Sequence, residues 1–333
     1  MRNLETFCSM DVDLVKTELE RFGIAVEVRT FSEIDVRRCD VVGRPVIYQS
    51  SEDEGLLYKS FIEDVLLALQ FRGACLVPSF YCFRSHHNKV FWELLRDAVS
   101  SEEVKSIQSR CYGVLEEFLP GGVEYPQVIK ASEGAGSRGV HLAHNAAEAA
   151  RKCEEITLSA NWRERLSERL SRKRIPGYVK RSLHRRKFVV QNFIGGLTHD
   201  YKVLAYGKKY YVVRRDNRPG DFRASGSGLL SWPEEPPQGL LDFASKVFGA
   251  FDAPAMSMDI AHDGEHFHLI EGQFVCFGPK SLQDSSHYFT PAEPGWRRVV
   301  EPSVLEEEFA RCVAAYLERE QGGEPASTVG PTT

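Results

Sequence analysis

A lysine followed by a glycine-rich segment is the first group of residues in this 333-residue chain whose spacing could support chemistry. In VIKASEGAGSRGV, Lys130 ends an apolar run, and Gly134, Gly136 and Gly139 follow it. Glycine tolerates positive φ and lets backbone N–H groups approach an anion, so such a loop can enclose phosphate oxygens. The segment lacks the Gly-Lys-Ser/Thr ending of a Walker loop, so spacing alone favours a plain turn and a phosphate loop equally.

A pair of carboxylates nearer the C-terminus is the second candidate group. Asp259 lies in SMDIA and Glu271 in IEGQ, twelve residues later, with Asp263-Gly264 between them as a hairpin signal. The hairpin would place both acids on neighbouring strands, and strand alternation puts Glu271 and Gln273 on one face. Oxygen ligands of this kind suit Mg²⁺, which binds one or two carboxylates together with substrate phosphates. Spacing alone favours two solvated acids.

The apolar pattern predicts an α/β region at the start of the chain. Helical spacing at 11–22 and 56–71 alternates with apolar runs at 24–30, 44–50 and 74–78. This alternation is typical of helices between parallel strands.

The pattern changes after residue 86. We expect a helix at 89–99 capped by Asn88, a strand at 125–132, and a helix that starts at a capping box of Asn145 and Glu148. One antiparallel sheet and a closing helix at 304–320 then follow, with the strands of the sheet at 188–194, 201–207, 209–215 and 257–273.

Composition excludes several classes of protein. Hydrophobic residues make up 42% and charged residues 27% of the chain, and no run approaches the roughly 18 apolar residues needed to span a bilayer. The N-terminus lacks the apolar core of a cleaved signal, so we expect a cytoplasmic protein without a membrane partner. Eight scattered cysteines without a Cys-x-x-Cys pair argue against a zinc site or a disulfide framework. The net charge of -5 offers nucleic acid no general attraction.

The order of the candidate features along the chain resembles the ATP-grasp superfamily. Between residues 86 and 285 come a lysine before a helix, a strand lysine, a glycine loop, Gln-x-Phe-Ile, Asp-x-Lys, Gly-Asp-Phe-Arg, then Asp and Glu-x-Gln. The order is most similar to the branch of ribosomal-protein glutamate ligases, the RimK-like enzymes. The resemblance implies an N-terminal α/β domain at 1–85 and two subdomains, at 86–190 and 191–320, that grip ATP between antiparallel sheets. A disordered tail is expected at 321–333.

The resemblance also implies a role for each matched residue. The ATP phosphates would be held by Lys89 and Lys130 and covered by a lid loop that includes Gly134, Gly136, Ser137 and Gly139. The adenine would contact a hinge strand made of Gln191, Asn192, Phe193 and Ile194. Mg²⁺ would be bound by Asp259, Glu271 and Gln273.

The catalytic cations implied by the resemblance are Arg223, Lys202 and Arg215. A planar guanidinium at Arg223 suits the transferred phosphoryl group or a substrate carboxylate, because it can bind either through two parallel hydrogen bonds. The chain departs from the branch at Asn192, where Glu is usual, and at Ser225 and Gln273, where Asn is usual.

The implied activity is ATP- and Mg²⁺-dependent ligation of a small-molecule carboxylate to an amine through an acyl phosphate, with release of ADP and phosphate. Two alternatives stay open: a phosphotransferase of the same fold acting on a small molecule or sugar, and a degenerate scaffold that only binds nucleotide. Relatives of this kind also imply a homo-oligomer.

Residues 163–187 contain eleven Lys or Arg and two Glu and form a distinct connector. This stretch could bind an acidic polymer or a nucleic acid. Arginines and glutamates at helical spacing favour the other interpretation, a solvated and salt-bridged helix face.

Overall fold

The computed structural model describes residues 10–99, 101–105, 107–134, 139–275, 277–278 and 280–322. The chain divides into two compact units. Unit 1 contains Met1–His86, Ala98–Ser106 and Leu197–Thr333, and unit 2 contains His87–Asp97 and Ile107–Gly196. The domain boundaries predicted at residues 85, 190 and 320 stay a prediction, and the predicted tail lies outside the described residues from position 323 onward.

The N-terminal part of unit 1 contains the predicted alternation of helices and parallel strands. The first helix is capped by the Asp11 carboxylate, which accepts two backbone hydrogen bonds from the first turn. The two strands pair in parallel, as expected. The elements of this region are α1 (Val12–Arg21), β1 (Pro45–Ile47), α2 (Leu57–Phe71), β2 (Cys75–Val77) and α3 (Phe80–Ser85).

The strand predicted at 24–30 is wrong. Residues 24–29 belong to no strand, and Thr30 makes only an isolated bridge. Ile24 and Val26 pack against an apolar cluster that includes residues of α9 (Leu305–Gly322), so their burial comes from helix packing instead of strand pairing. The alternation of apolar residues therefore predicted correctly which side chains pack against the core, but it predicted wrongly that their backbone pairs with another strand.

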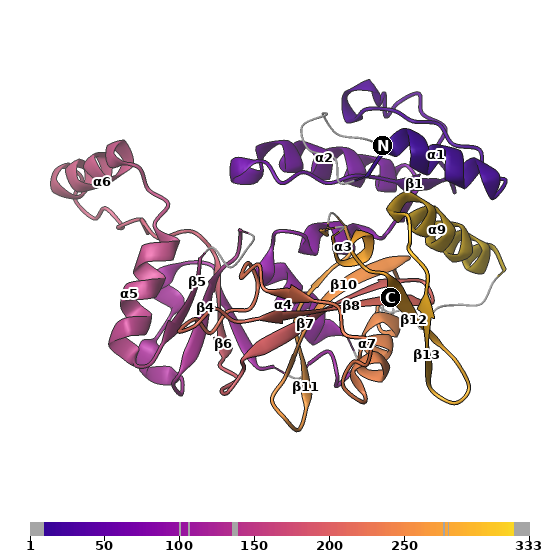
Figure 1. The fold of residues 1–333 in the computed structure, drawn as a ribbon. Coiled ribbons are helices and arrows are strands. Elements are labelled where there is room, and N and C mark those ends of the chain that lie inside the picture. The colour runs from indigo at the N-terminus through magenta and orange to yellow at the C-terminus, as the bar shows by residue number, and fades with distance from the viewer. Residues whose placement is uncertain are drawn as a thin grey trace. The chain divides into compact units, whose positions relative to one another are not determined.

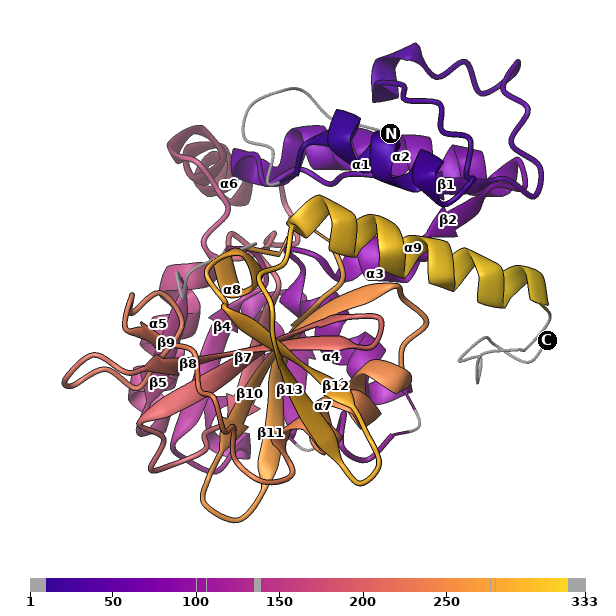
Figure 2. The ribbon, with the colours of Figure 1, turned by 45° about the vertical axis from the view of Figure 1, so that its right-hand side comes forward.

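An antiparallel sheet forms the centre of unit 1 (Figures 1 and 2). Its strands follow the order β11–β10–β7–β8–β12–β13, and β9 pairs with β8. The two hairpins expected from the sequence are present, turning at Gly207 and at Asp263-Gly264. The strands are β7 (His199–Tyr206), β8 (Lys209–Asp216), β9 (Leu230–Ser231), β10 (Ala255–His262), β11 (Phe267–Gln273), β12 (His287–Pro291) and β13 (Trp296–Val300).

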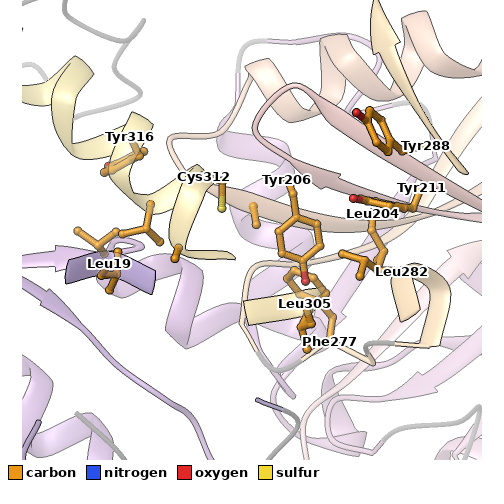
Figure 3. Close-up of a cluster of buried hydrophobic side chains, with 14 of the residues drawn as sticks. Leu19, Leu204, Tyr206, Tyr211, Phe277, Leu282, Tyr288, Leu305, Cys312 and Tyr316 are labelled. Carbon is orange, nitrogen blue, oxygen red and sulfur yellow. The ribbon is translucent and has the colours of Figure 1, made fainter. Parts of the chain in front are cut away.

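Helices cover both faces of this sheet. Tyr210 and Tyr211 are consecutive on β8 and therefore point to opposite faces. The Tyr210 ring contacts Phe248 of α7 (Leu240–Gly249), with 6.4 Å between ring centroids. Tyr211 belongs to the cluster that α9 and α8 (Lys280–Gln283) cover. Figure 3 shows this cluster, with sheet residues beside Leu282, Leu305 and Cys312.

Unit 2 is built on a four-stranded antiparallel sheet in the order β3–β6–β4–β5. Helix α5 packs on it, with Ala149 and Cys153 buried against Ile129 and Phe188 (Figure 1). The prediction that 188–194 joins the later strands in one sheet is wrong, because β6 is hydrogen-bonded between β3 and β4. The elements are α4 (Lys89–Ala98), β3 (Ser109–Tyr112), β4 (Gln127–Ala131), β5 (Val140–Ala143), α5 (Ala146–Thr157) and β6 (Phe188–Asn192).

The basic connector of unit 2 contains a helix, α6 (Trp162–Arg174), that begins with a capping box of Asn161 and Glu164. Figure 1 shows α6 standing clear of the unit 2 sheet, joined to it by the segments that lead from α5 and to β6. In the part of the chain described here, the one ion pair of α6 joins Glu164 to Arg185. The helix is largely exposed to solvent, as the interpretation of a solvated face expects, but the described ion pairs include none between an arginine and a glutamate that both lie in α6.

Within the described residues, no helix has both the length and the apolar character needed to cross a membrane.

Candidate active site

The glycine loop of unit 2 connects β4 to β5 as the tip of a hairpin. The Gly139 carbonyl accepts a hydrogen bond of 2.8 Å from the backbone N–H of Ala131. Gly139 has a φ of +72°, and a Cβ there would lie 2.9 Å from the Cβ of Ala131, so this position requires glycine. Gly134, at the other end of the loop, also has a positive φ. Gly136 and Ser137, which were predicted to contact phosphate, lie outside the described residues.

The two predicted phosphate lysines lie at the same end of β4. Lys130 is buried on the strand, and Lys89 is the buried first residue of α4. The Lys89 backbone N–H donates to the Ser132 carbonyl at 2.8 Å, and its Nζ donates to the Gly134 carbonyl at 2.7 Å. The positive end of the α4 dipole and the Lys89 ammonium group therefore meet beside the glycine loop, an arrangement that favours an anion.

The predicted adenine strand is hydrogen-bonded to a buried ion pair that no sequence pattern predicted. The Gln191 amide donates to Glu93 Oε1 at 3.3 Å, and the Ser109 hydroxyl donates to Glu93 Oε2 at 2.6 Å. Glu93 also pairs with Arg96, one helical turn later, and both side chains are buried. Asn192 Oδ1 accepts a hydrogen bond of 3.0 Å from Gln127. Contact of Gln191, Asn192, Phe193 and Ile194 with an adenine stays a prediction.

The acidic group of unit 1 lies on β7, β8, β10 and β11. Asp259 is the cross-strand partner of Glu271 on one side and of Lys202 on the other. A β-bulge follows Asp259, where the register of β10 against β11 shifts. Bulges re-aim side chains and are frequent beside functional sites. The sequence indicated the Asp259 and Glu271 pairing but not the bulge.

Arg215 links two carboxylates. Its Nε and one terminal nitrogen donate to Asp200 at 2.6 and 2.7 Å, and it also pairs with Asp259 at 2.8 Å. Lys202 Nζ lies 3.9 Å from the other oxygen of Asp259. Asp200 and Arg215 are directly opposite each other on β7 and β8, so the hairpin register sets this pair.

Burial and the neighbouring charges together set the pKa values of Arg215 and Asp200. Burial acts to lower the pKa of Arg215, but the charges of Asp259 and Asp200 outweigh it and raise that pKa. Burial also raises the pKa of the Asp200 carboxyl to about 6, against the opposing pull of Arg215. The guanidinium is thus a buried, permanently charged link that fixes the position of Asp259.

The Arg223 guanidinium is held by its neighbour Asp221. Arg223 Nε and one terminal nitrogen donate to the two Asp221 oxygens at 2.9 and 2.8 Å, and the backbone N–H of Arg223 also donates to Asp221. These hydrogen bonds lower the pKa of the Asp221 carboxyl. Arg223 is partly exposed, and its role on a phosphoryl group stays a prediction.

The donor set of Asp259, Glu271 and Gln273 fits Mg²⁺. Two of the three are carboxylates on paired strands, and the third is an amide on the same strand as Glu271. Among the residues that the structure describes, no group donates a hydrogen bond or forms an ion pair with the Glu271 carboxylate. Mg²⁺ prefers oxygen ligands, and the Glu271 carboxylate can serve as one without breaking another described contact.

Comparisons with known proteins give matches in structure only. No family model matches the chain, and no curated protein matches it. The crystal structure of the D-cycloserine synthetase DcsG aligns with a TM-score of 0.55 and 12% identity, over 93% of this chain and 95% of that chain. A RimK domain ATP-grasp protein from Sphaerobacter thermophilus aligns with a TM-score of 0.51 and 11% identity, over 95% and 98%. At these identities the likeness is one of fold.

Proposed function

We propose that this chain, which has the ATP-grasp fold, is an ATP- and Mg²⁺-dependent ligase that joins a small-molecule carboxylate to an amine. One observation carries the proposal: Asp259 and Glu271 are cross-strand partners on a fold whose matched structures include a synthetase. Buried Arg215 and half-buried Lys202 lie beside the Asp259 carboxylate of this pair, and positive charge at such a place is what phosphoryl transfer requires.

Unit 2 supplies groups that bind the triphosphate. Lys89 and Lys130 would neutralise the α- and β-phosphates, and the loop between Gly134 and Gly139 would close over the γ-phosphate. The Gly139 end of this loop is tied to β4 by the hydrogen bond from the Ala131 N–H to the Gly139 carbonyl, and Lys89 Nζ is held at the Gly134 end. An ammonium group that is already in position lowers the cost of organising charge during the reaction.

Unit 1 supplies the residues that would hold the metal and the transferred group. Asp259, Glu271 and Gln273 would bind Mg²⁺, which when bound would supply positive charge to the phosphate oxygens. Arg215 keeps the Asp259 carboxylate in place through its second partner, Asp200. Arg223 would bind the transferred phosphoryl group or the substrate carboxylate.

The proposed reaction has two steps. A carboxylate oxygen of the substrate attacks the γ-phosphorus of ATP, the bond to the bridging oxygen of ADP breaks, and an acyl phosphate forms. The amine then attacks the acyl carbon, phosphate leaves, and a proton passes from the amine to solvent. The protein's contribution is to position the reactants, stabilise charge and keep water from the acyl phosphate.

The proposal is tested by incubating the protein with ATP, Mg²⁺ and a panel of carboxylic acids and amines, with mass spectrometry of the products. Hydroxylamine, added in place of the amine, should trap the acyl phosphate as a hydroxamate. If acids give neither ADP nor hydroxamate while an alcohol stimulates ADP release, the chain is a phosphotransferase and ligation is the wrong class.

The Glu271→Ala variant separates an enzyme from a binding scaffold. We expect turnover to fall roughly 100-fold or more, because a bound metal ion stabilises the transition state by several kcal/mol. Glu265→Ala is the matched control, since Glu265 is an exposed glutamate at the turn of the same hairpin. Nucleotide binding without turnover in the wild-type protein, measured by calorimetry, would support the scaffold alternative instead.

A further inference from the structure

Helix α6 presents a line of exposed apolar side chains. Trp162, Leu166 and Leu170 are spaced four residues apart, so they form one stripe along the helix. Their exposed fractions are 69%, 50% and 38%. Ile175 and Val179, just beyond the helix, are also exposed. Large apolar side chains gathered in this way mark an interaction surface.

The two glutamates of α6 lie on the opposite side of the helix from this stripe. Glu168 accepts hydrogen bonds from the Tyr178 hydroxyl at 2.7 Å and from the Arg181 backbone at 2.9 Å. Glu164 accepts one from Arg185 at 3.1 Å. The acidic face therefore holds α6 to the chain segment that returns to β6, and this attachment turns the apolar stripe away from that segment.

Basic residues lie on both sides of the stripe. On an α-helix, Arg165, Arg169 and Lys173 fall along one edge of the stripe and Arg163 and Arg174 along the other. All five are exposed. The segment 163–187 has a net charge of +9, with eleven basic and two acidic residues, whereas the chain as a whole has -5. The rest of the chain therefore has a net charge of -14, and positive charge is concentrated on this connector.

We propose that α6 is an interfacial helix that binds this chain to an anionic lipid surface. A bilayer presents phosphates in a layer above an apolar layer, which matches an apolar stripe with cations along both edges. The guanidinium groups can bind phosphate through two hydrogen bonds each. A nucleic acid would satisfy the charges but leave the apolar stripe, Ile175 and Val179 exposed.

This surface departs from the expectation that the protein has no membrane partner. That expectation was based on composition and on the length of apolar runs, which can reveal only helices that span a membrane. A helix that lies on a membrane surface needs only apolar side chains along one side. The inference is independent of the proposed ligase activity, because it concerns a part of unit 2 that contains none of the predicted site residues.

The experiment is sedimentation of the full-length protein with vesicles of phosphatidylcholine and phosphatidylserine, and with vesicles of phosphatidylcholine alone. We expect binding to the mixed vesicles only, and weaker binding at high salt because the attraction is screened. Replacement of Arg165, Arg169 and Lys173 by Gln should weaken binding by a factor of roughly five for each residue removed. Replacement of Trp162, Leu166 and Leu170 by Ser should weaken it at least about tenfold.

The matched control is the Leu57→Ser, Phe71→Ser variant, which removes two apolar side chains of α2 that are 78% and 93% exposed. This control should bind mixed vesicles as the wild type does. Circular dichroism and ATP binding should be unchanged in every variant, because the replaced side chains are exposed. The proposal is overturned if the wild type ignores mixed vesicles, if it binds neutral vesicles equally well, or if the serine variant retains full binding. Binding of RNA or an acidic peptide, with vesicles left unbound, would also overturn it.

Discussion

Replacement of Arg215 by Met should cost the fold more than any other single change in the acidic group of unit 1. Met keeps most of the volume but removes two charge-assisted hydrogen bonds to Asp200 and the ion pair with Asp259. Asp200 is buried and would be left without its cation. Removing one member of a buried ion pair costs about 3–5 kcal/mol, because the other charge stays out of water.

The effect should depend on pH in a direction that follows from the burial of Asp200. Burial raises the pKa of this carboxyl to about 6 even with Arg215 present, and without the arginine the pKa rises further. A carboxyl whose folded-state pKa lies above its unfolded-state value contributes stability at low pH and loses it as pH rises through the folded-state pKa. The variant should therefore be closest to wild type near about pH 5 and furthest from it near about pH 8.

The assay is urea unfolding at both pH values in the presence of EDTA, so that no metal ion contributes. Arg214→Met is the matched control: Arg214 precedes Arg215 on β8 but forms an exposed pair with Asp216. Such a pair is worth at most about 1 kcal/mol. Adding Asp200→Asn to Arg215→Met should recover most of the loss, since no buried charge then stays unpaired. Equal costs for the two methionine variants, or a cost that is the same at both pH values, would refute the reasoning.

Two further predictions concern the glycine loop and the thiols. Gly139→Ala should destabilise unit 2 by at least about 1 kcal/mol in thermal unfolding, because the position has a positive φ and the new methyl group would clash with Ala131. Gly121→Ala is the control and should leave the stability unchanged, since its methyl group would have no neighbour within 4 Å among the residues described. With a thiol reagent at neutral pH, the exposed Cys75 should react first of the cysteines described, since burial raises the pKa of Cys82, Cys153 and Cys312 to about 12. Faster labelling of a buried cysteine than of Cys75 would show that the helices open.

Periodicity predicted most of the regular elements, and the order of motifs predicted the fold. The helix at 89–99 and the hairpin at 257–273 appear as α4 and as β10 with β11, because their apolar spacing and turn residues are local signals. The predicted ATP-grasp fold is confirmed by the structural matches. The roles assigned to individual site residues stay predictions.

The errors and omissions arise where a contact is not local. Residues 188–194 have a strand pattern, but the pattern does not say which sheet the strand enters, and β6 joins the sheet of unit 2. The pairing of Asp200 with Arg215 depends on the register of the β7–β8 hairpin. Once the turn at Gly207 is placed, counting back along both strands shows that Asp200 and Arg215 face each other. The pairing could therefore have been predicted from the sequence, but only after the register of the hairpin was known.

The contact between α1 and α9 has a consequence for synthesis of the chain. The backbone N–H of Asp11 donates to Glu306 Oε1 at 2.9 Å, across 295 positions of sequence, and Leu19 is buried in the cluster that α9 completes. The sheet of unit 2 ends at β6, so it can form while the nascent chain is still on the ribosome. Helix α1 is translated before unit 2 but cannot bury its apolar face against α9 until α9 has been translated, so apolar residues of unit 1 stay exposed after the sheet of unit 2 has formed.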